Sequence, residues 1–500
     1  MSTLLVGTEP EVRLLAHQLA MVRGRDPIAG IVIVEGDEIG DLVAACAGRT
    51  ISLAIMTAPR GRRAELAAVR RRLETMGIPA RFIAPLSEQA DVRVAERPAG
   101  ARPPEQVLDP AALVGRAPHE IDREQVGSII DGRTVLVTGA GGSIGSELVR
   151  VCAQFAPRRI VLMERAENAL FEIDRSIGSR FPGLDRVALL HDVVDERRTL
   201  DLVKTFAPDV IFHAAAHKHV PLMEDHPAHA VENNVFGTKS IADAAVAVGA
   251  ERFVLISSDK AVRPSSVMGA TKRLAERYVQ ALAADPSHDT RLSMVRFGNV
   301  LGSSGSVLTI WDAQLAEGGP LTVTDERMTR YFMTIAEAAS LVVQAAAFSG
   351  TGPHPAGTRS GEVYVLDMGE PVRILDLAAR YAMASGYTPV LAGRTPPPTD
   401  CPIIEIVLTE ARPGEKLHEE LAYRAEQLEP TAHPGIRAMG EKDPIDPAQA
   451  ARVIEDLAPA RGCTERARVL DLIRRHVPDI TPGGDLGQPT EPAIPDQEAA

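Results

Sequence analysis

The sequence predicts an α/β protein in which two parallel sheets are built one after the other. Short apolar runs alternate with stretches of helical periodicity, and this alternation is typical of βαβ units. The alternation occurs twice, on either side of a Pro- and Arg-rich segment at residues 95–110. The chain of 500 residues also exceeds what one hydrophobic core usually holds, so more than one domain is expected.

The first block, residues 1–94, is predicted to be a small, degenerate Rossmann-like domain. Its apolar runs are "TLLVG", "GIVIVE", "ISLAIM" and "ARFIAP". The turn after the first run carries Gly7 alone and places Glu9 and Pro10 where a phosphate cradle needs small residues with free N–H groups. We therefore expect a structural or regulatory domain that does not bind a dinucleotide.

The second block opens with a strand, a glycine-rich turn and a helix, in "TVLVTGAGGSIGSELVR" at 134–150. Glycines at 139, 142 and 145 permit a tight turn, close approach of a pyrophosphate and packing of the helix on the strand. The next apolar run, "RIVLME", ends in Glu164, at the distance where a carboxylate accepts hydrogen bonds from ribose hydroxyls. This context predicts a dinucleotide site and favours NAD, because a carboxylate repels the extra phosphate of NADP.

Two charged residues near this turn leave alternatives open. Arg165 follows Glu164 directly and is also suited to cap a phosphate. Asp192, after "VALLHD", is either an acceptor for the adenine amino group or an ordinary loop aspartate. The candidate cofactor contacts are Gly139, Gly142, Ser143, Ile144, Gly145, Glu164, Arg165, Asp192, Ala214 and Lys272.

The composition argues against several other classes of protein. The 54 basic and 67 acidic residues give a net charge of −13, which does not suit a nucleic-acid partner held by bulk charge. The cysteines are scattered without a CxxC pair, so neither a disulfide framework nor a zinc site is expected; they are Cys46, Cys152, Cys401 and Cys463. No stretch approaches the roughly 18 apolar residues of a membrane span, and the N-terminus lacks a basic leader region. We expect a cytoplasmic protein without a membrane span.

A series of ordered segments resembles the nucleotide-sugar 4,6-dehydratases of the extended short-chain dehydrogenase/reductase superfamily. The segments are "TGAGGSIGSEL", "VIFHAAAHKHVPLMEDHP", "ENNVFGTKS", "SSDKAVRPSSVMGATKR", "RFGNVLGSSGSV", "MTRYFMTIAEA" and "RPGEKLHEEL". They are most similar to the polysaccharide-biosynthesis branch that acts on UDP-N-acetylglucosamine, and the resemblance covers roughly residues 112–425. Longer members of that branch carry transmembrane helices ahead of the first domain, which we do not expect here.

The resemblance, together with composition, divides the chain into parts. Residues 95–130 are expected to be a linker, and residues 131–425 an NAD-binding domain with a doubly wound parallel sheet and a small C-terminal substrate-binding part. Residues 426–480 are expected to form a helical extension. The Pro/Gly-rich acidic tail at 481–500 is expected to be disordered.

The resemblance implies an NAD-dependent reaction on a UDP-sugar. In this reaction a hydride leaves C4 of the sugar, water is eliminated across C5 and C6, and the hydride returns to C6. By resemblance, Asp259 protonates the departing C6 oxygen and Lys260 removes the C5 proton. We expect the nearby Lys272 and the nicotinamide cation to lower the pKa of Lys260, because only a neutral amine acts as a base. Lys272 is also expected to hydrogen-bond the nicotinamide ribose.

One position departs from the usual catalytic pattern of the superfamily. Met268 stands four residues before Lys272, where a tyrosine usually acts, and its thioether has no ionisable proton. The similar branch that makes the retained-configuration 4-keto sugar also carries methionine there, and Ser258, Asp259 and Lys260 are present, so we expect catalysis. The base for the C4 hydroxyl stays open between Asp259 acting twice and Lys272 acting through the ribose or a water.

Three residues resemble contacts to the sugar nucleotide. Asn299 resembles a residue that touches its phosphates, and Arg412 resembles an arginine that clamps the UDP pyrophosphate, for which a bidentate guanidinium is suited. Arg330 either assists or forms an ordinary surface ion pair. The resemblance further implies a homodimer through paired helices. An epimerase on the same scaffold and a non-catalytic NAD-binding regulator remain alternatives, as does a galactose-configured substrate.

Four more polar residues are expected to serve the structure. His213, His217 and His219 lie across a strand end and a turn with no acidic triad beside them, so packing or contacts to the substrate edge are expected in place of a metal site. Asn234, in "NVFGT", resembles the asparagine that pins the active-site helix.

Overall fold

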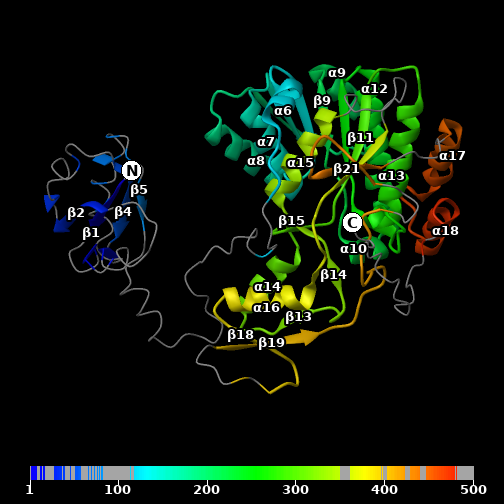
Figure 1. Ribbon diagram of the computed structural model, residues 1–500. Coiled ribbons are helices and arrows are strands. Elements are labelled where there is room, and N and C mark those ends of the chain that lie inside the picture. Colours follow the sequence, from blue (N-terminus) through cyan, green and yellow to red (C-terminus); the bar gives the residue numbers. More distant parts are fainter. Residues whose placement is uncertain are drawn as a thin grey trace, which may run out of the picture. The chain divides into compact units, whose positions relative to one another are not determined.

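The chain folds into two compact units, Met1–Glu105 and Gln106–Leu315 with Gly319–Ala500 (Figure 1). The computed structural model describes parts of residues 2–82, Leu113, and residues 118–348, 361–395, 397, 402–422, 428–439, 446–478 and 480. The turn residues Glu9 and Pro10, Cys401, most of the expected linker and the tail 481–500 lie outside the described residues. The predictions made for them are therefore untested.

The first unit contains a mostly parallel sheet, as predicted. Its strand order is β3-β2-β1-β4-β5, in which β3 alone is antiparallel to its neighbour. The strands are β1 (Ser2–Gly7), β2 (Ile28–Glu35), β3 (Glu38–Ile39), β4 (Ile51–Thr57) and β5 (Ala80–Phe82). A Cβ atom at Gly7 would lie 1.9 Å from the carbonyl oxygen of Thr57, so this glycine permits the close approach of β1 and β4.

The second unit is built on a nine-stranded sheet with the order β20-β21-β16-β11-β10-β9-β6-β7-β8. The strands from β16 to β8 in this order are parallel, and β21 and β20 are added antiparallel at one edge. The strands are β6 (Thr134–Thr138), β7 (Arg159–Glu164), β8 (Arg186–Leu190), β9 (Val210–His213), β10 (Arg252–Ile256), β11 (Arg291–Arg296), β16 (Glu362–Leu366), β20 (Leu428–Pro430) and β21 (Ile436–Met439). The strand order reverses between β6 and β9, and ligands of such sheets bind at the carboxyl ends beside this point.

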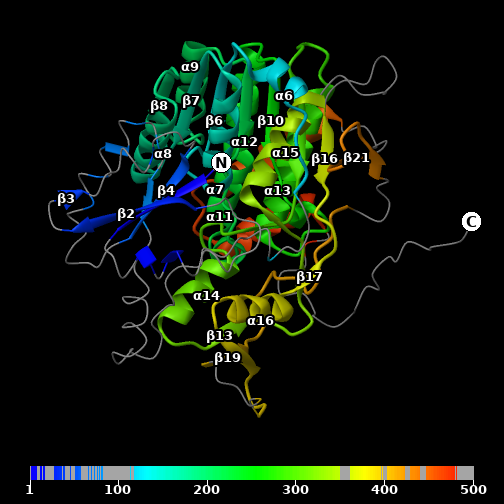
Figure 2. The same cartoon turned by 60° about the vertical axis from the view of Figure 1, so that its left-hand side comes forward.

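Helices cover both faces of the large sheet (Figure 2). One face packs against α6 (Arg123–Ile130), α7 (Ser143–Cys152), α8 (Glu167–Arg180) and α15 (Ile335–Phe348), and the other against α9 (Glu196–Phe206), α12 (Gly237–Ala247) and α13 (Val267–Ala284). In β6, Val135 and Val137 face the first layer while Leu136 faces the second. Burial on both faces explains why the strands read as continuous apolar runs.

Part of the segment expected to be a linker is described by the structure and packs on the second unit. The side chain of Asp122 caps α6 by accepting hydrogen bonds from the amides of Glu124 and Gln125. Val126 and Ile130 of α6 are buried in the core of the large sheet. Residues 118–130 therefore belong to the second unit.

A small lobe lies below the large sheet in the view of Figure 1. It contains α14 (Val307–Ala316), α16 (Ile374–Ala384) and a three-stranded sheet of β13 (Leu321–Val323), β19 (Ile403–Leu408) and β18 (Thr388–Leu391). Its core surrounds Trp311 and Tyr381, whose ring centroids are 5.6 Å apart. The lobe follows β12 (Asn299–Leu301), which leaves the carboxyl end of β11 and pairs with β15 (Phe332–Thr334).

The outer face of α13 is covered by the last described helices of the chain. These are α17 (Pro447–Leu457) and α18 (Arg466–His476), and Figure 1 shows them beside α13 on the side away from the sheet. Leu457, Val469 and Ile473 form an apolar cluster with residues of α13 that include Met268 and Leu274. The segment expected to be a helical extension thus contains two strands, β20 and β21, as well as these helices.

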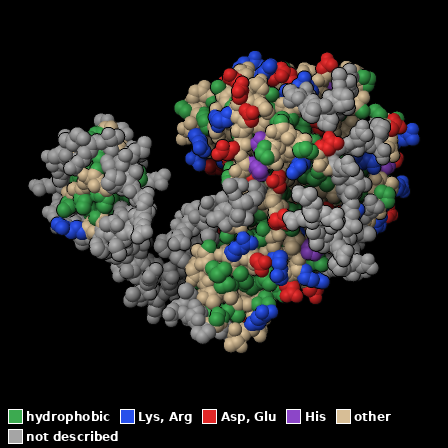
Figure 3. Space-filling view, in the orientation of Figure 1, with side chains coloured by type: hydrophobic (Ala, Val, Ile, Leu, Met, Phe, Trp, Pro, Cys, Tyr) green, Lys and Arg blue, Asp and Glu red, His purple; other side chains and the backbone are tan. Residues whose placement is uncertain are grey.

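The described surface carries mixed charge. On the face shown in Figure 3, acidic and basic side chains are interspersed over the second unit, without a broad basic patch among the described residues. In the part of the chain that the structure describes, none of the helices is both long enough and apolar enough to cross a bilayer.

Candidate active site

The glycine-rich turn joins β6 to α7 at the point where the strand order reverses. Gly139 has a φ of +64°, and a Cβ atom there would lie 2.8 Å from the backbone of Ala214 and Ala215. A Cβ atom at Gly145 would lie 2.0 Å from the carbonyl oxygen of Gly139. Glycine at both positions therefore lets the turn, the helix and the chain after β9 approach one another. The first amides of α7 have no acceptor within the helix and are suited to bind phosphate.

A cavity of about 290 Å³ opens beside this turn. Six of the predicted cofactor residues line it: Gly139, Gly142, Glu164, Arg165, Asp192 and Ala214. Its wall also includes His191, Ala215, Ala216, His217 and Asn233, which the sequence did not single out for the cofactor. Ser143, Ile144 and Gly145 belong to the same turn and helix, whereas Lys272 lies on α13.

Glu164 holds the glycine-rich turn by its carboxylate. Oε2 accepts a hydrogen bond from the amide of Gly141 at 3.1 Å, and Oε1 accepts from the amides of Arg165 and Ala166 at 2.9 and 3.0 Å. The guanidinium of Arg165 lies 3.4 Å from Oδ2 of Asp192 and forms an ion pair with it. The two charged residues whose roles the sequence left open are therefore paired with each other at the cavity.

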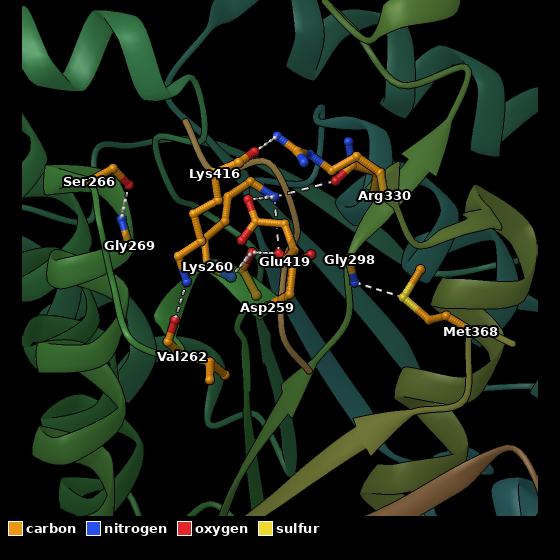
Figure 4. Close-up of polar contacts among 12 residues, drawn as sticks. Asp259, Lys260, Val262, Ser266, Gly269, Gly298, Arg330, Met368, Lys416 and Glu419 are labelled. Atoms are coloured by element: carbon orange, nitrogen blue, oxygen red, sulfur yellow. Dashed lines mark hydrogen bonds and ion pairs between the residues drawn. The ribbon is translucent and has the colours of Figure 1, made fainter. Parts of the chain in front are cut away.

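Asp259 and Lys260 follow β10 in a 3₁₀ turn, Asp259–Ala261 (Figure 4). The Asp259 side chain is fully buried, and its Oδ1 accepts hydrogen bonds from Ser258 Oγ at 2.9 Å and from Lys260 Nζ at 3.0 Å. Lys260 Nζ also lies 3.3 Å from Asn299 Oδ1. The fold thus brings together four predicted site residues, and Asp259 Oδ2 is left without a partner among the described residues.

Glu419 is a second acidic neighbour of Lys260 that the sequence analysis missed. Its Oε1 lies 3.9 Å from Lys260 Nζ, and Figure 4 shows it beside the Asp259–Lys260 pair. Glu420, the next residue, pairs instead with Arg263 at 3.6 Å. The motif "RPGEKLHEEL" contains both glutamates, and its spacing alone does not tell which one turns towards the site.

The pKa of Lys260 is raised, contrary to the expectation from the sequence. Burial lowers this pKa, but the negative charges of Asp259 and Glu419 outweigh burial, and the positive charge of Arg330 opposes them only in part. The expectation did not include Glu419, and Lys272 is not among the charges that shift the pKa of Lys260. The effect expected of the nicotinamide cation stays a prediction. Lys260 is therefore held as an ammonium ion beside two carboxylates.

Lys272 has the lowered pKa that was expected of Lys260. Its Nζ donates a hydrogen bond to the carbonyl oxygen of Ile256 at 2.6 Å. Burial lowers the pKa of Lys272 to about 8, and the charge of Glu276 opposes this shift in part. Met268, one turn earlier on α13, is buried in the apolar cluster with α17 and α18.

A buried ion pair fixes α13 to the strands beneath it. Arg296 of β11 donates to both carboxylate oxygens of Glu276 of α13, at 2.7 and 2.8 Å, and neither side chain is exposed. Ser257 Oγ donates to the same carboxylate at 2.7 Å. Burial alone would raise the pKa of Glu276, but Arg296, Arg273 and Ser257 together lower it to about 2. Arg296 thus ties the helix that carries Lys272 to β11, and Ser257 ties it to the end of β10 just before Asp259.

Asn234 links α13 to the turn after β9, in keeping with the structural role expected of it. It lies in the π-helical turn Val231–Phe236, and its side chain donates to Thr271 Oγ1 and to the carbonyl oxygen of His217, both at 3.1 Å. His213 lies between Thr138 and Thr238. Burial and, to a smaller extent, the charge of Lys272 lower the pKa of His213 to about 3, so this ring is neutral. Among the described residues, no group of His, Cys, Asp and Glu side chains is arranged to hold a metal ion.

The two candidate arginines differ in their surroundings. Arg330 is buried and donates to the carbonyl oxygens of Lys416 at 2.8 Å and Leu417 at 3.1 Å, so it does not form the surface ion pair that the sequence left open. Arg412 is exposed, and its guanidinium pairs with no other described residue. Its role towards a pyrophosphate stays a prediction.

The chain is similar to proteins of polysaccharide synthesis. The probable polysaccharide biosynthesis protein EpsC of Bacillus subtilis (strain 168) is 44% identical over 384 residues, which are 75% of this chain and 59% of that protein. The capsular polysaccharide biosynthesis protein CapD of Staphylococcus aureus is 45% identical over 315 residues, 63% of this chain and 49% of that protein. The chain thus spans only about half to three fifths of the length of these relatives.

A more distant relative and a solved structure are also similar. An inverting UDP-N-acetylglucosamine 4,6-dehydratase of Campylobacter jejuni subsp. jejuni serotype O:23/36 (strain 81-176) is 31% identical over 218 residues, 43% of this chain and 64% of that protein. The X-ray structure of Pen from Bacillus thuringiensis is 28% identical, with a TM-score of 0.53, and covers 63% of this chain and 89% of that one.

The family model described as "Polysaccharide biosynthesis protein" matches residues 135–441, which hold the large sheet, the glycine-rich turn and the Asp259–Lys260 pair. The match covers more than half of the chain, and the second unit has the α/β fold of the short-chain dehydrogenase/reductase enzymes. The chain therefore belongs to the polysaccharide biosynthesis protein family of the extended short-chain dehydrogenase/reductase superfamily.

Proposed function

We propose that this protein is an NAD-dependent 4,6-dehydratase of a UDP-N-acetylhexosamine, with UDP-N-acetylglucosamine as the expected substrate. The observation that carries the proposal is the buried 3.0 Å contact between Asp259 and Lys260. A 4,6-elimination needs an acid and a base at adjacent carbons, whereas an exchange of configuration at C4 alone does not. The name of the Campylobacter relative and the membership of the family support the same chemistry.

The residues around the glycine-rich turn fit NAD. The close approach at Gly139 and Gly145 leaves the cavity beside the first amides of α7, and Glu164 offers a carboxylate at its wall. NAD held in this cavity would supply the acceptor for the hydride from C4 and the donor of the hydride to C6. Asp192 lines the same cavity, and the carboxylates there favour a ribose with free hydroxyls over one that carries a phosphate.

The Asp259–Lys260 pair must exchange one proton before it acts. In the structure, Lys260 is the donor and Asp259 the acceptor, as in an ammonium and a carboxylate. One proton moved along this hydrogen bond gives an amine and a carboxylic acid without a change in net charge. Lys260 then takes the C5 proton while Asp259 protonates the oxygen that leaves C6. The C5–H and C6–O bonds break, a C5–C6 double bond and water form, and the pair returns to its ionic state.

This proton count supports Lys272 as the acceptor for the proton of the C4 hydroxyl. Asp259 has already received a proton from Lys260, and it keeps this proton for the oxygen that leaves C6. It therefore cannot also accept the proton of the C4 hydroxyl. Lys272 has a pKa lowered to about 8, so an appreciable fraction of it is neutral near that pH. Of the two alternatives that the sequence left open, this is the one we propose.

The function is tested by incubating the purified chain with UDP-N-acetylglucosamine and NAD and recording the mass of the product. A dehydratase is expected to give a product lighter by one water. An epimerase gives an isomer of unchanged mass, and a non-catalytic regulator gives no product, so either outcome would overturn the proposal. UDP-N-acetylgalactosamine, assayed in parallel, decides between the two hexosamines. The homo-oligomer implied by the resemblance stays a separate prediction.

Replacing Glu164 with alanine is expected to weaken NAD binding by about 1–3 kcal/mol, the cost of leaving hydrogen-bonding groups unpaired. The ribose hydroxyls would lose their acceptor, and the amides of Gly141 and Arg165 would lose theirs. Calorimetric titration with NAD measures the change. Glu167→Ala removes the same charge from an exposed position three residues later and is the matched control. An unchanged affinity in Glu164→Ala would place the ribose contact elsewhere.

A further inference from the structure

Glu419 has features of a functional carboxylate that no part of the proposed reaction has yet used. Its side chain is only 4% exposed, and it places one oxygen 3.9 Å from Lys260 Nζ. Its second oxygen, Oε2, is buried and has no partner among the described residues. An unpaired buried carboxylate oxygen is costly, and groups of this kind that persist in a fold are commonly completed by a ligand or water.

The segment that carries Glu419 is attached firmly to the catalytic turn. Lys416 Nζ donates to the carbonyl oxygen of Val262 at 2.9 Å, and Arg330 holds the carbonyl oxygens of Lys416 and Leu417. Glu420, the next residue, forms a partly exposed ion pair with Arg263 at 3.6 Å. The contacts of Lys416 and Leu417 therefore hold the segment of Glu419 next to Lys260, as a preorganised site requires.

Both carboxylates beside Lys260 have one buried oxygen without a described partner. Asp259 Oδ2 is the other buried carboxylate oxygen of this site without a described partner. Two carboxylates around one Lys260 give the site an excess of acceptors, which hydroxyl and amide N–H donors satisfy. A hexosamine carries several such donors, whereas the pyrophosphate of a sugar nucleotide carries none.

We propose that Glu419 is a further substrate-binding residue, whose Oε2 accepts a hydrogen bond from the sugar ring of the substrate while Oε1 keeps its charge beside Lys260. This inference rests on the proposed function for the identity of the sugar. It assigns to one side chain two effects, on affinity for the sugar and on the proton of Lys260. Loss of a residue with a purely structural role would weaken binding of UDP as well as of the sugar nucleotide, and would not change the pKa of Lys260 specifically.

The test compares Glu419→Gln, which keeps the shape and removes the charge, with the matched control Glu420→Gln. Calorimetry with UDP-N-acetylglucosamine and with UDP is done on NAD-loaded protein. Glu419→Gln is expected to weaken binding of the sugar nucleotide roughly 10- to 100-fold, as for a lost hydrogen bond to a charged group, and to leave UDP binding unchanged. Glu420→Gln should bind both ligands as the unmodified protein does.

The pH profile supplies the second readout. The Asp259–Lys260 pair works with one shared proton, which it loses to solvent as the pH rises through the pKa of Lys260, and the charge of Glu419 contributes to raising this pKa. The limb on which kcat/KM falls towards high pH is therefore expected to move to lower pH in Glu419→Gln. Equal affinity for the sugar nucleotide in Glu419→Gln and the unmodified protein, or an equal loss of affinity for UDP, would overturn the inference. The binding measurement needs no turnover, so failure of the dehydratase proposal is distinguished from failure of this one.

Discussion

Asp259→Asn and Lys260→Met are each expected to lower the rate of water loss from UDP-N-acetylglucosamine by about two to four orders of magnitude, as for other general acids and bases. Asparagine keeps the size of Asp259 but has no acidic proton for the C6 oxygen. Methionine keeps the length of Lys260 but cannot take the C5 proton. The product is quantified by mass spectrometry under single-turnover conditions, so that slow product release does not mask the chemical step.

The two variants also report on the separate half-reactions. With C5 deprotonation blocked and C4 oxidation intact, Lys260→Met should accumulate enzyme-bound NADH, which absorbs in the near ultraviolet. The same signal in Asp259→Asn is expected if Lys272 receives the C4 proton, as the proton count supports. Absence of the signal in both variants would mean that the pair is needed already for C4 oxidation. Full turnover by Lys260→Met would remove the main argument for a dehydratase.

Met268→Leu is the control for this experiment, since it changes the helix that carries Lys272 without removing an ionisable group. Met268 is 3% exposed and belongs to the apolar cluster between α13 and the last two helices. An exchange of methionine for leucine nearly conserves volume and usually costs less than about 1.5 kcal/mol of stability. We expect Met268→Leu to retain appreciable activity, in contrast to the variants of Asp259 and Lys260.

Arg296→Met is expected to lower the free energy of unfolding by about 3–5 kcal/mol, because it leaves the Glu276 carboxylate buried without its partner. Urea or thermal unfolding measures the change. The matched control is Arg175→Met, which breaks an exposed pair with Glu172 of similar length and should change stability by less than about 1 kcal/mol. Replacing Arg296 and Glu276 together by apolar residues should recover part of the loss. A stability equal to that of the control would show that Glu276 is accommodated in another way.

The role of the Arg296–Glu276 pair can also be measured through the dependence of the free energy of unfolding on pH. The pKa of Glu276 is lowered to about 2 from an unperturbed value of 4.5. Its contribution to stability is therefore fully present above pH 4.5 and is lost as the pH falls from there towards 2. In Arg296→Met, the burial that raises this pKa remains while the strongest of the interactions that lower it is lost, so the pKa of Glu276 is expected to rise and the loss of stability towards low pH is expected to be smaller.

Local sequence signals were sufficient for the parallel sheet, the glycine-rich turn and the Asp259–Lys260 pair. Gly145 meets Gly139 within the same turn, and Asp259 is adjacent to Lys260 in the chain itself, so these constraints act locally. Gly139 also meets Ala214 and Ala215, which follow β9, the strand that pairs with β6. Alternation of apolar runs and helices therefore predicts both the fold and the edge of the sheet where the site lies.

Contacts between distant segments could not be predicted in the same way. Glu419 reaches Lys260 from a segment that is held by Arg330, and nothing in the spacing of that segment distinguishes Glu419 from Glu420. The direction of the pKa shift of Lys260 could not be predicted for the same reason. One of the two negative charges that raise this pKa is that of Glu419, which lies near Lys260 only in the folded chain. A charged residue within an apolar strand, as in "SMVRFG", was the available signal for the buried ion pair of Arg296.

The packing of α18 on α13 has a consequence for synthesis of the chain. About 190 residues lie between Ala284, where α13 ends, and His476, where α18 ends. At ordinary rates of translation these take roughly 10–40 s to add, and domains form as the chain leaves the ribosome. During that interval only the earlier residues of the same apolar cluster, at 220–236, are present beside Leu274, and the part of the cluster formed by α17 and α18 is still missing. The helix that carries Lys272 is thus made early, and its apolar cluster is completed only when α17 and α18 have been synthesised.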